Sequence, residues 1–265
     1  PLLLKQGHSV TVFDILMFGG EPIIPFFREP LFNCIIGDVR NPKALSQVCS
    51  KHDAVIHLAA IVGFPACRKD PALATETNVV GSRNILDATT KQQIVVLAST
   101  GTNYGAVEDG VCTERTPLRP LSHYGVTKTT AEELFLDAGR ATVFRFATAF
   151  GISPRLRLDL LINDFVRIAL TQSYLVLYER HFMRTFIHVH DMARAFALAL
   201  ENQDEMRGEA YNVGSESMNC SKQQICDRIQ HFLPEFHVHH AEVGVDEDKR
   251  NYVVSYDKIE STGFE

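Results

Sequence analysis

The sequence lacks an excess of positive charge and long apolar runs, and each absence narrows the range of functions. Its 26 Lys and Arg against 32 Asp and Glu give a net charge of −6. That balance argues against non-specific binding to nucleic acid or to an anionic membrane, since both need a basic surface. No apolar run approaches the roughly 20 residues that cross a bilayer, and the opening PLLL is too short for a signal peptide.

Paired cysteines and metal-ligand clusters are also missing. Six cysteines are scattered without a CxxC pair or a regular spacing. Such a pattern is typical of reduced, packed thiols in a reducing compartment, so we expect a cytoplasmic protein. His237 and His239 belong to an HVHH segment, but no Cys or carboxylate constellation accompanies them. We therefore expect no metal site.

The first half of the chain alternates short, nearly continuous apolar segments with helical ones. Runs rich in Val, Ile and Phe are typical of strands buried on both faces of a parallel sheet. Their alternation with helices indicates a doubly wound, Rossmann-like α/β fold. The expected strands cover residues 8–14, 32–38, 53–60, 93–100 and 141–148, and the expected helices cover residues 42–51, 70–89 and 122–139.

The second half is less regular, because the sheet pattern ends near residue 151. We therefore expect two domains, residues 1–150 and 151–265. Asp191 is expected to cap its helix, and Ser221 with Gln224 to form a capping box. The expected helices of this half cover residues 157–170, 191–202 and 221–232, and the expected strands cover residues 184–189 and 209–214.

Several residues at strand ends are suited to a cofactor, because ligands of doubly wound sheets bind at the carboxyl ends of the strands. Asp14 closes the first expected strand. Its carboxylate can accept hydrogen bonds from a ribose diol and repels a 2′-phosphate, which favours NAD over NADP; it could instead cap a turn. Asp38 and Val39 end the next strand, and the small Ala59 and Ala60 allow a ligand to approach the backbone closely.

Tyr124 and Lys128 lie four residues apart in the segment SHYGVTKTTAEEL, so they share one face of the expected helix. A neighbouring positive charge favours the phenolate of a tyrosine, whose ordinary pKa is about 10. The pair can therefore act as a general base toward a hydroxyl, and as the acid in the reverse direction. By itself, this spacing is common in ordinary helices.

Nine segments of the chain occur in the order seen in extended short-chain dehydrogenases/reductases. More narrowly, the chain resembles the NAD-dependent epimerase/dehydratase family that acts on nucleotide sugars. The resemblance covers nearly the whole chain and implies NAD as cofactor, a nucleotide sugar as substrate, and a homodimer whose interface includes the Tyr124 helix. The segments are VTVFD, GDVRN, HLAA, NVVGSRNILDA, LASTGTNYG, YGVTK, FRFATAFG, RTFIHVHD and YNVG.

The resemblance implies that NAD is held by residues at strand ends and on the catalytic helix. Toward the adenosine end these are Asp14, which holds the ribose, and Asp38 and Val39, which flank the adenine. Toward the pyrophosphate and nicotinamide ribose they are Leu58, Ala59, Ala60, Asn78, Tyr124 and Lys128. Asn78 is expected either to contact the cofactor or to orient the strand-end loops.

One family element is missing from the sequence. The family begins with a strand and a GxxGxxG loop, whose backbone N–H groups reach the dinucleotide pyrophosphate. Here the opening PLLLKQGHSV resembles the end of the helix that follows that loop. The missing strand is central, so its loss leaves a gap in the sheet with unpaired backbone groups. We therefore expect the chain to lack its start.

By the same resemblance, the catalytic hydroxyl of LASTGTNYG is Thr100, with Ser99 as the second choice. The 4,6-dehydratases of the family carry Asp-Glu directly after this threonine. Gly101 and Thr102 stand there instead, and neither acts as a general acid or base at neutral pH. We therefore expect C4 epimerisation through a transient keto sugar, with Tyr124 as the acid and base.

Three further residues match family positions that contact the substrate. Arg184 and Arg250 match those that bind the phosphates of the nucleotide sugar, and a guanidinium can grip phosphate oxygens bidentately. Either arginine could instead form a surface ion pair. Thr148 stands where relatives often carry an Asn that touches the sugar diphosphate.

Two other functions stay open from the sequence. An NAD(P)-dependent dehydrogenase or reductase of sugar nucleotides or keto substrates uses the same threonine, tyrosine and lysine. A catalytically impaired relative could serve as a binding module, for which the missing glycine loop is the only argument. The intact set of Thr100, Tyr124 and Lys128 favours an enzyme.

Overall fold

The computed structural model describes residues 1–241 and 251–265, and these fold into two units. The chain passes from one unit to the other several times, so neither is a single stretch of sequence. The first unit comprises residues 1–103, 120–145 and 193–211, and the second comprises residues 104–119, 146–192 and 212–265. Among the described residues, no helix is both long and apolar enough to span a bilayer.

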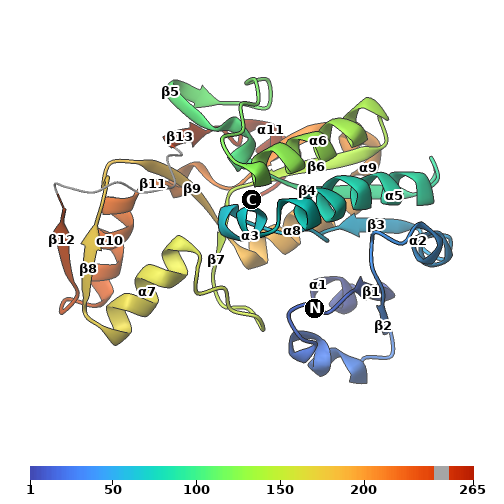
Figure 1. Cartoon of the computed structure of the whole chain (residues 1–265), viewed down its shortest axis with the longest axis horizontal. Helices are drawn as coiled ribbons and strands as arrows, with labels where there is room; N and C mark the ends of the chain where they lie inside the picture. The colour runs from blue at the N-terminus through green and yellow to red at the C-terminus, as the bar shows by residue number, and fades with distance from the viewer. Residues whose placement is uncertain (242–250) are drawn as a thin grey trace. The chain divides into compact units, whose positions relative to one another are not determined.

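The first unit begins with a parallel pair of strands. A short helix, α1 (Leu2–Lys5), leads into β1 (Val10–Asp14), which pairs with β2 (Phe32–Ile36) so that Asp14 lies beside Ile36. The 3-10 helix η1 (Glu21–Arg28) connects the two strands and was not predicted from the sequence. The parallel pairing of β-branched and aromatic segments agrees with the predicted α/β class (Figure 1).

A second sheet of this unit packs against α6 (His123–Asp137), the helix that contains Tyr124 and Lys128. Its strand order is β10-β6-β4-β3, with β3 (Ala54–His57) parallel to β4 (Ile94–Thr100). β6 (Ala141–Phe146) and β10 (Ala210–Val213) run from the first unit into the second. In the described part of the chain, β1 pairs only with β2, and β3 only with β4, so the two sheets are separate ladders. The predicted parallel α/β fold is confirmed.

Helices surround these strands and bury an apolar core. Leu45, Ile85, Leu97, Phe135 and Val143 belong to one buried cluster, which joins helices to β4 and β6. The helical elements that lie wholly or mostly in the unit are α2 (Pro42–Cys49), α3 (Phe64–Lys69), α4 (Pro71–Thr75), η2 (Glu76–Val80), α5 (Gly81–Ala88), η3 (Gly101–Tyr104), α6 (His123–Asp137), α8 (Val189–Glu201) and α9 (Gln203–Met206).

Two helix predictions need correction. The helix expected over residues 70–89 is interrupted by η2, a single π-helical turn that the apolar periodicity does not reveal. Asp191 was expected to cap its helix, but α8 begins at Val189, so Asp191 lies inside the first turn. A carboxylate there still interacts favourably with the positive end of the helix dipole.

The second unit contains three small sheets and its own core. Leu175, Phe186, Ile225 and Phe236 are among its buried apolar residues. The capping box of Ser221 and Gln224 is confirmed at the start of α10. The elements are β5 (Ala106–Cys112), β7 (Thr148–Phe150), α7 (Leu161–Thr171), β8 (Tyr174–Leu177), β9 (Met183–His188), η4 (Glu216–Met218), β11 (Asn219–Ser221), α10 (Lys222–Phe232), β12 (His237–His240), β13 (Asn251–Val254) and α11 (Asp257–Glu260).

Strand pairings of the second unit run β11-β9-β7, β12-β8 and β13-β5. The strands β5, β8 and β13 were not predicted: β8 and β13 have only four residues each, and the sequence of β5 contains the polar segment EDG, which is not typical of a buried strand. The histidines of the HVHH segment form β12, which pairs in parallel with β8. Within the described residues, no group of three or more His, Cys, Asp or Glu side chains could hold a metal ion.

Candidate active site

Thr100 is the last residue of β4 and is buried at the carboxyl end of that strand. Its Oγ1 donates a hydrogen bond to Thr102 Oγ1 at 3.0 Å and accepts one from the Thr102 backbone N–H at 3.2 Å. The turn of η3 therefore fixes the orientation of the Thr100 hydroxyl. Thr102 entered the sequence argument only as a replacement for a dehydratase acid, so its contact with Thr100 was missed.

The helix α6 carries Tyr124 in its first turn and Lys128 in its second. Ser122 begins the helix by accepting a hydrogen bond from Gly125 N at 3.1 Å, as a serine N-cap does. This start places Tyr124 and Lys128 on one helix face. The helix α6 packs against β4 within the first unit. The helix with Tyr124 and Lys128 is therefore a neighbour of the strand that ends at Thr100.

Lys128 is only 4% exposed. Burial lowers its pKa to about 8, and the negative charge of Glu132 and the thiol of Cys67 oppose that shift. A lysine with a pKa near neutrality is unusual, and such perturbed groups cluster at functional sites. The burial of Lys128 therefore supports the predicted role of this helix face.

Asn78 connects the loop after β3 to α6. It lies in the π-helical turn η2, where its Oδ1 accepts from Ile61 N at 2.7 Å. Its Nδ2 donates to Ile61 O at 3.0 Å and to Thr127 Oγ1 at 2.9 Å. Thr127 in turn donates to the carbonyl of Tyr124 at 2.9 Å. Both amide protons of Asn78 are thus used within the protein, in the loop-orienting role that the sequence offered as one of two readings.

His57, at the end of β3, is a buried site residue that sequence reasoning missed. Its Nε2 lies 3.0 Å from Ser82 Oγ, which donates to the carbonyl of Asn78 at 2.6 Å. Burial and then the charge of Lys128 lower the pKa of His57 to about 3, so the imidazole is neutral at physiological pH. The signal that could have found it is a histidine inside an otherwise apolar strand.

At the carboxyl end of β1, the Asp14 side chain is exposed, and its Oδ1 accepts from Leu16 N at 2.7 Å. Among the described residues, its Oδ2 has no hydrogen-bond partner, so one oxygen is available to a ligand. After β2, Asp38 accepts the guanidinium of Arg40 through Nη2 at 2.6 Å and Nε at 2.9 Å. These hydrogen bonds from Arg40 lower the pKa of Asp38. Asp14 is thus the more available of the two carboxylates.

The apolar residues predicted to line the cofactor differ in exposure. Val39 is buried in the core and packs so closely on Gly81 that a Cβ there would lie 2.8 Å from a Val39 methyl group. The predicted strand over residues 53–60 ends at His57, so Leu58, Ala59 and Ala60 form the loop beyond it. Leu58 is 57% exposed, whereas Ala59 is partly buried against the core.

Two of the residues predicted to contact the substrate, Thr148 and Arg184, belong to the second unit. Thr148 begins β7 opposite Phe186 of β9. Arg184, in β9, is 2% exposed; its Nη1 donates to Met183 O at 3.1 Å, and its guanidinium carbon lies 5.8 Å from the centroid of the Phe182 ring. Arg184 is therefore buried, unlike an arginine in a surface ion pair. Arg250 lies outside the described residues.

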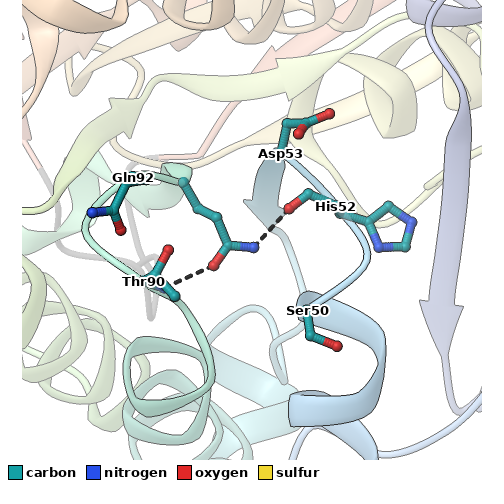
Figure 2. Close-up of a pocket in the computed structure, with 6 residues that line it drawn as sticks. Ser50, His52, Asp53, Thr90 and Gln92 are labelled. Atoms are coloured by element: carbon teal, nitrogen blue, oxygen red, sulfur yellow. Dashed lines mark hydrogen bonds between the residues drawn. The ribbon is translucent and has the colours of Figure 1, made fainter.

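A hollow of about 320 Å³ lies at the amino ends of β3 and β4, opposite the end where Thr100 lies (Figure 2). Its lining residues precede β3 and β4, and Gln93 joins the two loops by donating to Cys49 O and His52 O, both at 2.7 Å. Ligands of parallel sheets bind at the carboxyl ends, where Thr100 lies, and not at the amino ends. We therefore interpret this hollow as part of the contact between two loops and not as a ligand site. It is lined by Ser50, His52, Asp53, Thr90, Gln92 and Gln93.

Comparison with known proteins identifies the family. Residues 1–214 match the model of the family described as "NAD dependent epimerase/dehydratase family". A UDP-glucose 4-epimerase from Lacticaseibacillus casei is 29% identical over 80% of this chain and 71% of its own length. A UDP-N-acetyl-alpha-D-glucosaminuronate decarboxylase from Bacillus cytotoxicus is 29% identical over 81% of this chain and 70% of its own.

Solved structures support the same assignment. The crystal structure of a dTDP-glucose 4,6-dehydratase from Streptomyces venezuelae, which contains NAD, matches with a TM-score of 0.84. The two chains are 25% identical, and the match covers 100% of this chain and 86% of the dehydratase. The similar proteins are enzymes that catalyse different reactions on nucleotide sugars, and the family is NAD-dependent, as predicted. The chain belongs to the NAD-dependent epimerase/dehydratase family.

Proposed function

We propose that this protein is a nucleotide-sugar 4-epimerase that uses NAD and takes Tyr124 as its acid and base. The observation that carries the proposal is that one unit holds both an oriented Thr100 hydroxyl at the end of β4 and a buried Lys128 on the α6 face that carries Tyr124. The similarity to a UDP-glucose 4-epimerase supports the substrate class.

The first unit is suited to hold NAD. The exposed carboxylate of Asp14 and the exposed side chain of Leu58 stand at the ends of β1 and β3, and they fit a ribose diol and an apolar ring surface. We propose that Asp14 accepts hydrogen bonds from the adenosine ribose, and that Ala59 and Ala60 allow the cofactor to approach the backbone. Bound NAD would supply the acceptor and the donor of hydride.

Tyr124 would remove the proton of the sugar C4 hydroxyl and later return it. Lys128 favours the phenolate of Tyr124 through its positive charge, and the Thr100 hydroxyl would hold the same substrate oxygen by a hydrogen bond. Loss of the hydroxyl proton to Tyr124, together with transfer of the C4 hydride to bound NAD, would give a 4-keto sugar. Return of the proton after reduction from the other face of the sugar gives the epimer.

Gly101 and Thr102 are the argument against dehydration. Elimination of water from the sugar needs a general acid and a general base, and neither residue supplies one near neutral pH. The Thr102 hydroxyl is instead engaged with Thr100. Epimerisation needs only one proton-transferring group beside the hydride carrier, and this requirement matches Tyr124.

We further propose that residues of the second unit bind the substrate, with Arg184 gripping a phosphate oxygen. A guanidinium can bind phosphate oxygens bidentately, and Arg184 stands at the family position that the sequence resemblance assigned to a substrate phosphate. Arg250 and Thr148 keep their predicted substrate roles, as does the homodimer, which sedimentation velocity would test.

The experiment is incubation of the purified protein with NAD and a panel of UDP-, GDP- and dTDP-hexoses. Products are separated by anion-exchange chromatography, and NADH is followed by absorbance. We expect a C4 epimer without accumulation of NADH. Sustained NADH formation would instead indicate a dehydrogenase, and a 4-keto-6-deoxy sugar would indicate a dehydratase. Failure to bind NAD would leave a binding module.

A further inference from the structure

A buried carboxylate lies one helical turn beyond Lys128. Glu132, on α6, is 1% exposed. Its Oε2 accepts hydrogen bonds from Ser99 Oγ at 2.7 Å and from Asn103 Nδ2 at 3.2 Å. Its Oε1 accepts from Arg145 through Nε at 2.8 Å and through Nη2 at 2.5 Å. One carboxylate therefore connects α6 to the end of β4, to η3 and to β6.

The spacing places Glu132 in line with the catalytic pair. Tyr124, Lys128 and Glu132 follow one another at intervals of four residues, so they share one face of α6. Besides Tyr124, which precedes it by four residues, Lys128 interacts with ionisable groups on three elements: Glu132 on α6, Cys67 on α3 and His57 on β3. His57 is held neutral by burial, and burial also raises the pKa of Cys67, to about 11. Glu132 is therefore the one full negative charge among these groups.

Such a carboxylate is expensive to bury. Arg145, its ion-pair partner, is only 6% exposed, and two charges taken out of water together often stabilise a fold no more than apolar residues of similar size. Because folding alone gives this pair little advantage, a functional role for the charge is the better account. Glu132 lies one helical turn from Lys128 on the same helix, and its negative charge favours the protonated lysine.

We propose that Glu132 is a positioning residue that keeps Lys128 protonated and fixes the end of β4 against α6. Ser99, which Glu132 holds, directly precedes Thr100, so one carboxylate sets both the charge of the lysine and the position of the catalytic hydroxyl. The consequence for turnover rests on the proposed function. The consequence for the charge of Lys128 does not.

The test measures the charge of Lys128 directly. The side-chain nitrogen of Lys128 is followed by NMR over a pH titration and is assigned by its loss in Lys128→Met. In Glu132→Gln, we expect the pKa of Lys128 to fall by about one unit from its value of about 8 in the wild type. The matched control is Glu133→Gln, one residue along the same helix but exposed, which should leave the titration unchanged.

A second variant guards against loss of the fold, because Glu132→Gln leaves the buried guanidinium of Arg145 without its counter-ion. Glu132→Gln combined with Arg145→Met removes both charges, and Gln can still accept from Ser99. The pKa of Lys128 should fall in this variant too. An unchanged pKa in either folded variant would overturn the proposal, and so would failure of both variants to fold, since the role would then be structural.

Turnover separates this inference from the proposed function. If the wild type epimerises, both variants should show the alkaline limb of the kcat profile at lower pH, because Lys128 loses its proton earlier. A shifted Lys128 titration without epimerase activity in the wild type would reject the function but keep the positioning role. An epimerase whose Lys128 titration and pH profile ignore Glu132 would reject only the positioning role.

Discussion

The face of α6 that carries Lys128 and Glu132 and the carboxyl end of β1 differ in burial and in how many hydrogen bonds their side chains make within the protein. Lys128 and Glu132 are buried, and the Glu132 carboxylate is hydrogen-bonded to other elements of the same unit. Asp14 and Leu58 are exposed at their strand ends, and an Asp14 oxygen is left for a ligand. The comparison indicates that the groups proposed to move protons are fixed by contacts within the fold, whereas the groups proposed to hold the cofactor keep exposed atoms.

The largest effect is expected from removing the hydroxyl group of Tyr124 on α6. Tyr124→Phe should lower kcat about 10³-fold, the range lost when a general acid–base group is deleted, and should weaken NAD binding far less, because Lys128 and Asp14 keep their predicted contacts with the cofactor. Steady-state kinetics and a titration with NAD measure the two. Tyr174→Phe removes a hydroxyl from an exposed tyrosine of the second unit and should leave kcat as it is. Equal losses in the two variants would contradict the role of Tyr124.

His57 tests whether the interior around the end of β3 disfavours a charged side chain. Its pKa is lowered from 6.5 to about 3, so the unfolded chain binds the extra proton between these values. The contribution of His57 to stability is complete above pH 6.5 and is lost as the pH falls, by about 1.4 kcal/mol per pH unit. In His57→Gln, urea unfolding should show a shallower loss in acid. His8→Gln, at an exposed histidine, should keep the wild-type slope.

The contribution of Lys128 to stability should change with pH in the alkaline range, whereas that of His57 changes in acid. Because its pKa is lowered from 10.5 to about 8, the unfolded chain binds more protons between these values. The Lys128 contribution therefore rises with pH across this window, by about 3 kcal/mol in total. Lys128→Met should lack that rise, so its stability relative to the wild type should decline from pH 8 to pH 10.5. Parallel unfolding curves over this range would show that Lys128 is not held in a charge-penalising site.

The smallest effect is expected at the exposed end of β1. Asp14→Asn keeps the shape of the side chain but loses its charge, so NAD affinity should fall about tenfold, in line with one hydrogen bond to a charged group. Affinity for NADP should fall less, because the repulsion of a 2′-phosphate is also removed. Calorimetric titration with both cofactors measures the ratio. Asp53→Asn, at the amino end of β3, is the control that should change neither affinity.

The sequence predicted the elements of this site better than the contacts inside it. Apolar runs located β1 to β4 within a few residues, and the helix expected over residues 122–139 matches α6 to within two residues at each end. The capping box at Ser221 was readable because both partners are local in sequence. Helix and strand signals of this kind depend on neighbours along the chain, and for this reason they can be read without the structure.

Long-range contacts were not readable in the same way. Glu132 is an ordinary surface residue by composition, and only the packing of α6 on β4 and β6 brings it to Ser99 and Arg145. The π-helical turn that aims Asn78 at Ile61 has no periodic signature. Asp38 was predicted to contact the cofactor as Asp14 was, but the sequence does not reveal that Arg40 donates hydrogen bonds to its carboxylate. Each case is a tertiary interaction that overrides a local expectation.

The most direct test of the proposed reaction is the fate of the hydrogen at C4. A UDP-hexose carrying deuterium at C4 is converted by the protein with NAD, and both epimers are analysed by NMR. Hydride that leaves and returns within one site should give a C4 epimer that retains its deuterium, with no NADH accumulating. An epimer that has lost the label to solvent, or deuterium that collects in released NADH, would contradict epimerisation by transient oxidation.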